Sequence, residues 1–153
     1  MHIYNLALIG FGGVNRALAE LVRDRFSQPN ELGFTLRIVA ITNLSFGTWI
    51  DDRGIEPQTA LSIGATRGFC EFAGGSVEVD HYRAIVESAA DIVIEATYTN
   101  RTSGEPATSH IRWALSAGKH ASTTNKGRVR CSEPSFTSLL ACTASASSTR
   151  AVF

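Results

Sequence analysis

The sequence predicts an α/β fold built on a doubly wound parallel sheet, with helices covering both faces. Compact apolar segments of strand length alternate along the chain with segments in which apolar residues recur three and four positions apart. A glycine-rich stretch lies between the first such strand and the first such helix. The composition, 44% hydrophobic and 18% charged over 153 residues, is that of one globular domain with its own core. Together these observations favour a Rossmann-type domain.

The first unit of the fold is a strand, a turn and a helix. The apolar segment IYNLALIG, residues 3–10, is typical of a strand that is buried on both faces. The next apolar residues have helical spacing, and they are Val14, Ala17, Leu18, Leu21 and Val22. The segment FTLRIVAIT, residues 34–42, is rich in β-branched residues and predicts a second strand.

The middle of the chain is less regular. From Asn43 to about Gly75 the sequence is polar and contains glycine, with one short helix expected over residues 58–65. The segment VEVD, residues 77–80, has the alternation of a short strand. A further helix is expected from the spacing of Tyr82, Ile85, Val86 and Ala89.

A third unit follows. DIVIEAT, residues 91–97, predicts another buried strand, and Pro106 suits the first turn of a helix. That helix has its apolar stripe at Ala107, Ile111, Ala114 and Leu115. Gly118 suits a left-handed C-terminal cap, and HASTT, residues 120–124, predicts the strand after it. This alternation of strands and helices implies right-handed crossovers and a parallel sheet.

Charge and composition argue against several classes of protein. Fourteen basic and fourteen acidic residues cancel, so we expect no nucleic-acid partner. The apolar segments are far shorter than the roughly 20 residues of a membrane helix, and the N-terminus lacks the pattern of a signal peptide, so we expect a cytoplasmic protein without membrane contact. Three cysteines and four histidines show no metal-ligand spacing, so no metal site is predicted.

GFGGVN, residues 10–15, lies where a dinucleotide-binding fingerprint belongs, after a strand and before a helix. Gly10 permits a tight turn, and Gly12 lets the backbone approach a pyrophosphate. The third fingerprint glycine is replaced by Asn15, whose side chain must fit where the helix meets the strand. The candidate cofactor-binding residues are therefore Gly10, Phe11, Gly12, Gly13, Val14 and Asn15; a glycine-rich turn that binds nothing is the alternative.

The end of the second strand bears on the choice of cofactor. NAD-binding folds usually place a carboxylate there to hold the ribose, but this chain has Asn43 and Ser45 and no acidic residue before Asp51. No arginine stands beside them to bind the extra phosphate of NADP. Asn43 is a candidate cofactor contact, and the choice between NAD and NADP stays open.

Two more loops are expected at the same edge of the sheet, because ligands of parallel sheets bind beyond the carboxyl ends of the strands. Thr97 follows the strand of residues 91–96, and Asn125 and Lys126 follow the strand of residues 120–124. Lys126 is placed where the nicotinamide and a substrate would meet. A lysine that extends from a strand end into water is the alternative.

Three segments together resemble the N-terminal half of homoserine dehydrogenases. They are GFGGVNRALAEL, DIVIEATYTNRTSGEPATSHIRWALSAGKH and TTNKG, and the resemblance covers about residues 3–127. It implies interconversion of L-homoserine and L-aspartate 4-semialdehyde with NAD(P), a step toward threonine and methionine. By motif, the backbone of Phe11 to Asn15 holds the pyrophosphate, and Thr97 lies along the ribose and nicotinamide.

The resemblance gives the catalytic role to Lys126, which matches a family lysine between cofactor and substrate. Its ammonium group can polarise the substrate oxygen and stabilise alkoxide character. Glu95, a carboxylate near the end of a buried strand, is interpreted as a supporting residue, with a catalytic role as the alternative.

After Gly127 the resemblance ends. Residues 1–127 are predicted to be the dinucleotide-binding domain, and residues 128–153 a Ser/Thr-rich tail with one possible short helix near Phe136 and Leu140. The family's substrate and dimerisation domain is expected to be absent, through a shifted reading frame, a truncated gene or a partial gene model. Two hypotheses follow: the cofactor half of a homoserine dehydrogenase that can form homo-oligomers, inactive alone, or a non-catalytic dinucleotide-binding module or gene remnant.

Overall fold

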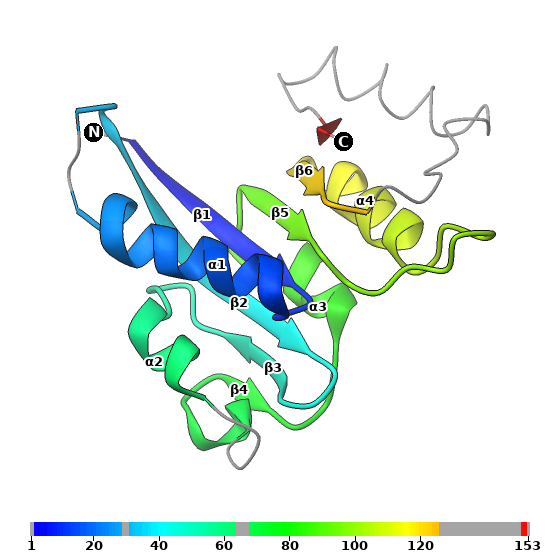
Figure 1. Ribbon diagram of the computed structural model, residues 1–153, viewed down its shortest axis with the longest axis horizontal. Coiled ribbons are helices and arrows are strands. Elements are labelled where there is room, and N and C mark those ends of the chain that lie inside the picture. The colour runs from blue at the N-terminus through cyan, green and yellow to red at the C-terminus, as the bar shows by residue number, and fades with distance from the viewer. Residues whose placement is uncertain (1, 29–30, 64–67, 126–150, 153) are drawn as a thin grey trace.

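The computed structural model describes residues 2–28, 31–63, 68–125 and 151–152. In this part of the chain, seven strands form one sheet in the order β4-β3-β2-β1-β5-β6-β7 (Figure 1). Their bounds are β1 His2–Ile9, β2 Phe34–Asn43, β3 Gly47–Ile50, β4 Gly75–Ser76, β5 Ile92–Glu95, β6 His120–Thr123 and β7 Ala151–Val152. All pairings are parallel except those of β3 with β2 and with β4.

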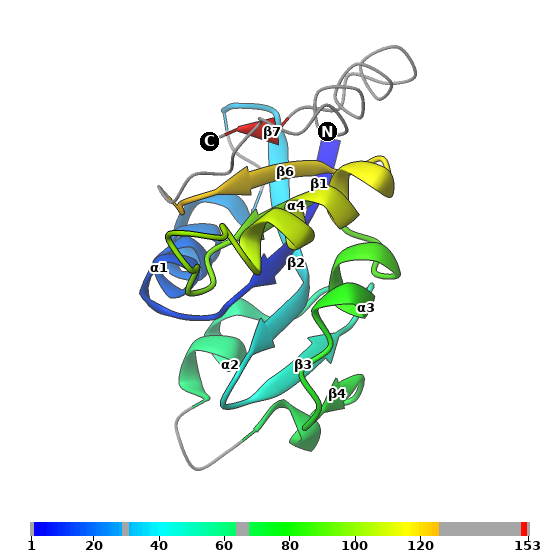
Figure 2. The ribbon, with the colours of Figure 1, turned by 90° about the vertical axis from the view of Figure 1, so that its right-hand side faces the viewer.

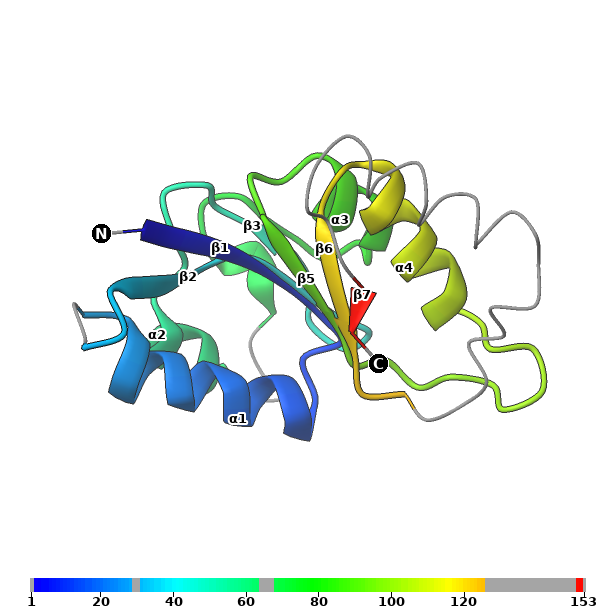
Figure 3. The same ribbon diagram turned by 90° about the horizontal axis from the view of Figure 1, so that it is seen from above.

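The helices form a layer on each face of the sheet. Seen from above, α1 (Gly13–Leu21) and α2 (Pro57–Ser62) lie below the sheet, and α3 (His81–Val86) and α4 (Ala107–Ser116) lie above it (Figure 3). One π-helical turn, η1 (Val22–Phe26), continues α1, and a short 3₁₀ helix, η2 (Phe69–Glu71), precedes β4. The predicted α/β fold with a doubly wound, largely parallel sheet is confirmed.

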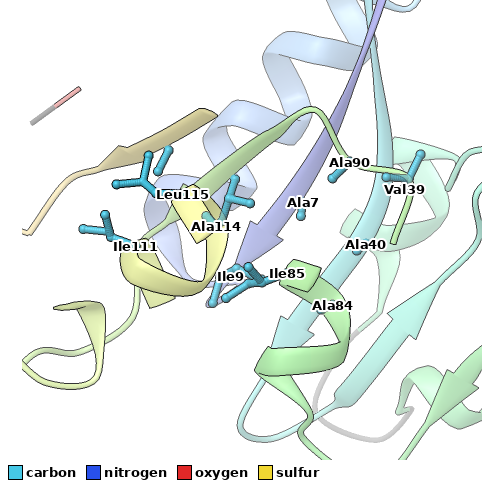
Figure 4. Packing of buried hydrophobic residues seen from close by; sticks show 12 residues of the cluster. Ala7, Ile9, Val39, Ala40, Ala84, Ile85, Ala90, Ile111, Ala114 and Leu115 are labelled. Carbon is cyan, nitrogen blue, oxygen red and sulfur yellow. The ribbon is translucent and has the colours of Figure 1, made fainter. Parts of the chain in front are cut away.

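Each face of the sheet has its own apolar core, because the central strands are buried on both sides. Ala7 and Ile9 pack with Ile85 of α3 and Leu115 of α4 (Figure 4). Val93 belongs to the same cluster. On the opposite face, the strand residues Leu6, Leu8, Ile38 and Ile41 pack with Ala19 and Val22 from the α1 side and with Ala60 of α2. Alternate residues of β1 thus serve opposite cores, which fixes the register of the strand.

The predicted strand at residues 77–80 is wrong. The chain instead forms β3 and β4 as an antiparallel extension of the sheet, with Trp49 opposite Gly75. Val77, which carried the apparent alternation, is 76% exposed. The close approach of β4 to its neighbours explains its composition: a Cβ on Gly75 would lie 1.7 Å from the carbonyl oxygen of Phe69.

The other elements predicted within the described residues are confirmed. Gly118, at a φ of 72°, ends α4 as expected. The predicted short helix at residues 58–65 corresponds to α2, whose N-terminal cap is the Glu56 side chain. Most of the predicted tail, with its possible short helix, lies outside the described residues. Its last described part, β7, pairs with β6 at Ala121 and Ser122, which the sequence analysis did not foresee.

The order of the strands places a topological switch beside β1. The chain leaves β1 for β2 on one side and later returns to place β5 on the other (Figure 1). Figure 2 shows the same arrangement further out, with β6 on one side of β1 and β3 on the other. Crevices at such switch points, beyond the carboxyl ends of the strands, are where doubly wound folds bind ligands. Within the described ranges, no helix has the length and apolar character needed to cross a membrane.

Candidate functional site

A pocket of about 440 Å³ opens at this crevice. Its walls come from the loops that follow β1, β2 and β5, together with the start of α3 and the approach to α4. The residues that line it are Gly10, Phe11, Gly12, Asn43, Leu44, Ser45, His81, Ala96, Thr97, Tyr98 and Pro106. Three loops that are far apart in the sequence therefore meet at one site, as the sequence analysis predicted for the glycine turn and Thr97.

A second hollow, of about 360 Å³, lies near the amino-terminal ends of β1 and β2, lined in part by Ile3, Thr35 and Arg37. It is at the opposite edge of the sheet from the glycine turn. Since ligands of parallel sheets bind at the carboxyl edge, we assign the functional site to the first pocket.

The glycine turn is held by the end of β2. The backbone N–H groups of Gly10 and Phe11 both donate to the carbonyl oxygen of Thr42, at 3.1 and 2.9 Å. Gly10 has a φ of 82°, and a Cβ there would lie 2.9 Å from the carbonyl oxygen of Ala96. Only glycine fits this position without strain.

Gly12 and Gly13 differ from Gly10: within the described residues, and apart from their chain neighbours and the backbone of α1 itself, no atom lies within 4 Å of where their Cβ atoms would be. Gly12 is the N-cap of α1, which begins at Gly13. The first N–H groups of a helix have no acceptor within the helix, and its N-terminus carries partial positive charge. The open space above both glycines therefore fits an anionic group such as a pyrophosphate.

Asn15 replaces the third glycine of the fingerprint and is fully buried. Its side-chain Nδ2 donates to the carbonyl oxygens of Ile9, Gly10 and Ile94, at 3.2, 2.9 and 3.3 Å. The side chain thus joins the start of α1 to the ends of β1 and β5. Any contact of Asn15 with a ligand in the pocket is therefore made by its backbone.

Asn43 also uses its side chain within the protein. Its Nδ2 donates to the carbonyl oxygen of Phe11 at 3.1 Å, and its Oδ1 accepts from the backbone N–H of Ser45 at 2.8 Å. Asn43 therefore shapes the loop after β2, while Leu44 beside it is 82% exposed at the pocket mouth. As far as the chain is described, the residues lining the pocket include neither a carboxylate nor a lysine or arginine.

Glu95, the last residue of β5, is fully buried and surrounded by donors. Its Oε1 accepts from the backbone N–H of Thr97 at 3.0 Å and from the Thr97 hydroxyl. Its Oε2 accepts from the Thr123 hydroxyl at 2.8 Å and from Asn125 Nδ2 at 2.6 Å. Asn125 Nδ2 also donates to the carbonyl oxygen of Thr97 at 2.9 Å. One carboxylate thus links the loops that follow β5 and β6.

Opposing effects act on the pKa of the Glu95 carboxyl. Burial raises this pKa, but the nearby His110 and the hydrogen bonds from Thr97 and Thr123 outweigh it, and the pKa lies below its ordinary value. Glu95 is therefore ionised at neutral pH.

Two histidines that the sequence analysis left unassigned lie at the site: His81 lines the pocket, and His110 contacts it from α4. His110 Nδ1, on α4, is 3.5 Å from Glu95 Oε1. The ring of His81, at the start of α3, lies edge-on to the His110 ring at a centroid distance of 4.7 Å, and its Nδ1 is 2.9 Å from the Thr42 hydroxyl. Burial, with a smaller effect from His110, lowers the pKa of His81 to about 4, so His81 is neutral at neutral pH.

The predicted site residues are thus only partly brought together. Thr97 and the glycine turn line one pocket, Val14 is half-exposed on the first turn of α1, and Asn125 reaches Thr97 through its side chain. Lys126 lies outside the described residues. Sequence reasoning missed the contributions of His81, Tyr98 and Pro106 to the pocket, because no local pattern marks them.

Comparison with known proteins gives consistent relatives. The chain is 48% identical over 128 residues to the NAD(+)-dependent homoserine dehydrogenase of Pseudomonas canavaninivorans, which covers 82% of this chain and 36% of that protein. It is 29% identical over 124 residues to the homoserine dehydrogenase of Methanocaldococcus jannaschii, covering 80% of this chain and 37% of that protein. The chain therefore spans about a third of the length of these curated relatives. No protein-family model matches it.

Solved structures share the fold. A hyperthermophilic archaeal homoserine dehydrogenase in complex with NADPH matches with a TM-score of 0.71 at 21% identity, covering 99% of this chain and 43% of that one. The homoserine dehydrogenase of Thermoplasma acidophilum matches with a TM-score of 0.71 at 16% identity and the same coverage.

Proposed function

We propose that this chain, which belongs to the homoserine dehydrogenase family over the region it shares with those relatives, forms the dinucleotide-binding domain of such an enzyme. The observation that carries the proposal is the pocket at the switch point, where the open space above Gly12 and Gly13 meets the N-terminus of α1. Side chains at Gly12 and Gly13 would fill the space in which a pyrophosphate would bind.

The residues that would hold the dinucleotide follow from the walls of the pocket. The backbone N–H groups of Gly12 to Asn15 would bind the pyrophosphate, since the Phe11 N–H is already bonded to Thr42. The loop after β2, at Asn43, would lie along the adenosine half. Thr97 and Asn125 would lie along the nicotinamide half, because the two halves of a dinucleotide bind on opposite sides of the switch point.

The curated relative in Pseudomonas canavaninivorans is named for NAD(+), and one structural neighbour is a complex with NADPH. We therefore propose a nicotinamide dinucleotide as the ligand without choosing between the two. The cofactor, when bound, supplies the hydride acceptor or donor for the interconversion of homoserine and aspartate 4-semialdehyde.

Lys126 is proposed as the catalytic residue. It directly follows Asn125, whose side chain is tied to Glu95 and Thr97 at the nicotinamide side of the pocket. A lysine ammonium group at this place would polarise the substrate oxygen and stabilise negative charge on it in the transition state. We propose that this domain comprises residues 1–127, because the sequence resemblance ends there.

Titration of the 153-residue chain with NADH and with NADPH, followed by nicotinamide fluorescence, tests the proposal. Saturable binding of either dinucleotide supports it. A separate assay with NAD⁺ or NADP⁺ as the hydride acceptor tests homoserine oxidation, and binding without oxidation is the result expected of a chain that is inactive alone. Absence of binding to both, by a chain whose circular dichroism shows it to be folded, would refute the assignment of the pocket.

A further inference from the structure

We propose that Glu95 is a positioning residue for the nicotinamide half of the dinucleotide: its carboxylate fixes the two loops that flank this half of the pocket. The inference rests on the proposed function, because it assumes that the pocket binds a dinucleotide. Glu95 does not line the pocket itself, and its effect would pass through Thr97 and Asn125.

Three of the four hydrogen bonds to the carboxylate come from residues beyond the ends of the strands. β5 ends at Glu95 and β6 ends at Thr123, and these two residues are already paired in the parallel ladder. Two of the partners, Thr97 and Asn125, come after the strand ends, in the loops. The strands are therefore held by their own backbone pairing, and the carboxylate acts chiefly on the conformation of the loops.

The donor set explains why an ionised carboxylate stands here. Both oxygens receive donors, and the Thr97 backbone N–H can never become an acceptor. Asn125 Nδ2 donates both to Glu95 Oε2 and to the Thr97 carbonyl oxygen. If the amide were flipped, Asn125 Oδ1 would face these two acceptors instead. A glutamine at position 95 would turn its own NH₂ group toward one of these two fixed donors in either orientation.

The burial of this group argues against a role in stability alone. An isolated buried carboxylate is costly, and an apolar residue of similar size usually serves a core as well or better. Glu95 instead makes four hydrogen bonds, and the Thr97 that it orients is part of the pocket wall.

The test compares two ligands that share the adenosine and pyrophosphate parts. NADH reports on the nicotinamide half, and ADP reports on the other half and lacks the nicotinamide. In Glu95→Gln we expect the dissociation constant of NADH to rise about tenfold, from one buried donor left unsatisfied, while that of ADP changes less than about twofold. The fluorescence of bound NADH should also move toward that of the free form, because the nicotinamide is less confined.

Ser88→Ala is the matched control. Ser88 is buried, and its hydroxyl donates to the Ala84 carbonyl oxygen at 2.6 Å, after the end of α3 and away from the residues of the pocket. This variant loses a buried hydrogen bond, so its thermal stability falls, but both dissociation constants should stay at the wild-type values.

Thr123→Val gives a milder change if Glu95→Gln does not fold. It keeps the shape of the side chain and removes the hydroxyl that donates to Glu95 Oε2. The backbone N–H of Asn125 also loses its acceptor, because it donates to the same hydroxyl. The same selective loss of NADH affinity is expected. Equal losses for NADH and ADP, or no loss for either, would overturn the positioning role. Failure of the folded wild-type chain to bind NADH and ADP would instead overturn the proposed function.

Discussion

At the glycine turn, neighbouring glycines are required for different reasons. Gly10 has a positive φ, and a Cβ at this position would lie 2.9 Å from the carbonyl oxygen of Ala96. Gly12 has a φ of −95°, and a Cβ there would point into open space. A side chain at Gly10 therefore conflicts with the protein itself. A side chain at Gly12 conflicts only with what the pocket binds.

We therefore expect Gly12→Val to separate binding from stability. Its side chain would occupy the place of the pyrophosphate and raise the dissociation constant of NADH by more than about tenfold, while stability changes by no more than about 1 kcal/mol. Fluorescence titration and chemical denaturation measure the two effects. Gly10→Val is the comparison, and it should lower stability strongly. Wild-type affinity in a folded Gly12→Val variant would remove the turn from the site.

Asn15 gives a second prediction, about stability. Asn15→Asp replaces a donor with a buried carboxylate that faces the three carbonyl oxygens of Ile9, Gly10 and Ile94. We expect a loss of at least about 3 kcal/mol in the free energy of unfolding, measured by urea denaturation at pH 7. Asn100→Asp is the control, because its Oδ1 only accepts, from Thr102 and Ser103, and the carboxylate preserves both bonds. Equal stabilities of the two variants would contradict the role of the Asn15 amide.

Motifs revealed this site only where the chemistry is local. The glycine turn could be predicted because its glycines are adjacent in the sequence and next to a strand. The partners of Glu95 could not, because Thr123 and His110 come from other elements and no spacing relates them to Glu95. For the same reason Asn43 and Asn15 were predicted as cofactor contacts, while their side chains bond the protein backbone.

Among the elements, prediction followed the strength of the periodic pattern. β1, β2 and the helices α1 and α4 have extended apolar patterns, and each was predicted near its true position. β5 and β6 have four residues each, and their positions were predicted from the apolar segment DIVIEAT and from the alternation of strands and helices. β3 and β4 were missed because they are short and contain glycine and polar residues. Their place depends on Phe69, Trp49 and Phe72, which pack together across elements.

The junction of α3, α4 and β2 predicts a pH dependence. His81 joins these elements through Thr42 and His110, and the charged or titratable groups that act on it are His110, Glu95 and Asp80. Its pKa falls from 6.5 to about 4 on folding. As the pH drops below 6.5, the unfolded chain takes up a proton that the folded chain refuses, so the free energy of unfolding should decrease between pH 6.5 and about 4.

Urea denaturation at several pH values measures this effect in wild type and in His81→Gln, which cannot titrate. The variant should lose less stability than wild type between pH 6.5 and pH 4. His2→Gln, at an exposed position, should behave like wild type. Parallel curves for wild type and His81→Gln would contradict the burial of a neutral His81.

Glu95 contributes to stability over a different pH range. Its pKa is lowered on folding, so its stabilisation is present above the ordinary value of 4.5 and is lost at lower pH.

At the scale of the whole molecule, the sheet has an apolar core on each face, and the site is built from loops at one edge of the sheet. Under the proposed function, such a domain would bind a dinucleotide with its own residues. A ligand that binds only the folded state at 100 times its dissociation constant adds about 2.7 kcal/mol of stability. We therefore expect saturating NADH to raise the melting temperature by about 5–10 °C, and Gly12→Val to abolish the shift.

Catalytic turnover requires more than dinucleotide binding, because homoserine must also be bound next to the nicotinamide. Hydride transfer needs the reacting carbon about 3–3.5 Å from the nicotinamide, and such positioning supplies roughly 7–11 kcal/mol of the barrier. The chain matches only 36% of the length of its Pseudomonas canavaninivorans relative. We expect the 153 residues alone to bind NADH but to oxidise homoserine far more slowly than that relative.

A fusion protein tests whether added substrate-binding residues give homoserine oxidation. Residues 1–127 joined to the remainder of the relative's sequence should oxidise homoserine, because substrate-holding groups are then supplied beside the pocket. In this fusion, Lys126→Ala should lower kcat by at least about a hundredfold while the dissociation constant of NADH stays within a few fold, since the ammonium acts on charge that develops in the transition state. Equal turnover by the unfused chain would show that its own residues hold homoserine. An unchanged kcat in Lys126→Ala would take the catalytic role away from this lysine and leave Asn125 and Thr97 as the nearest candidates.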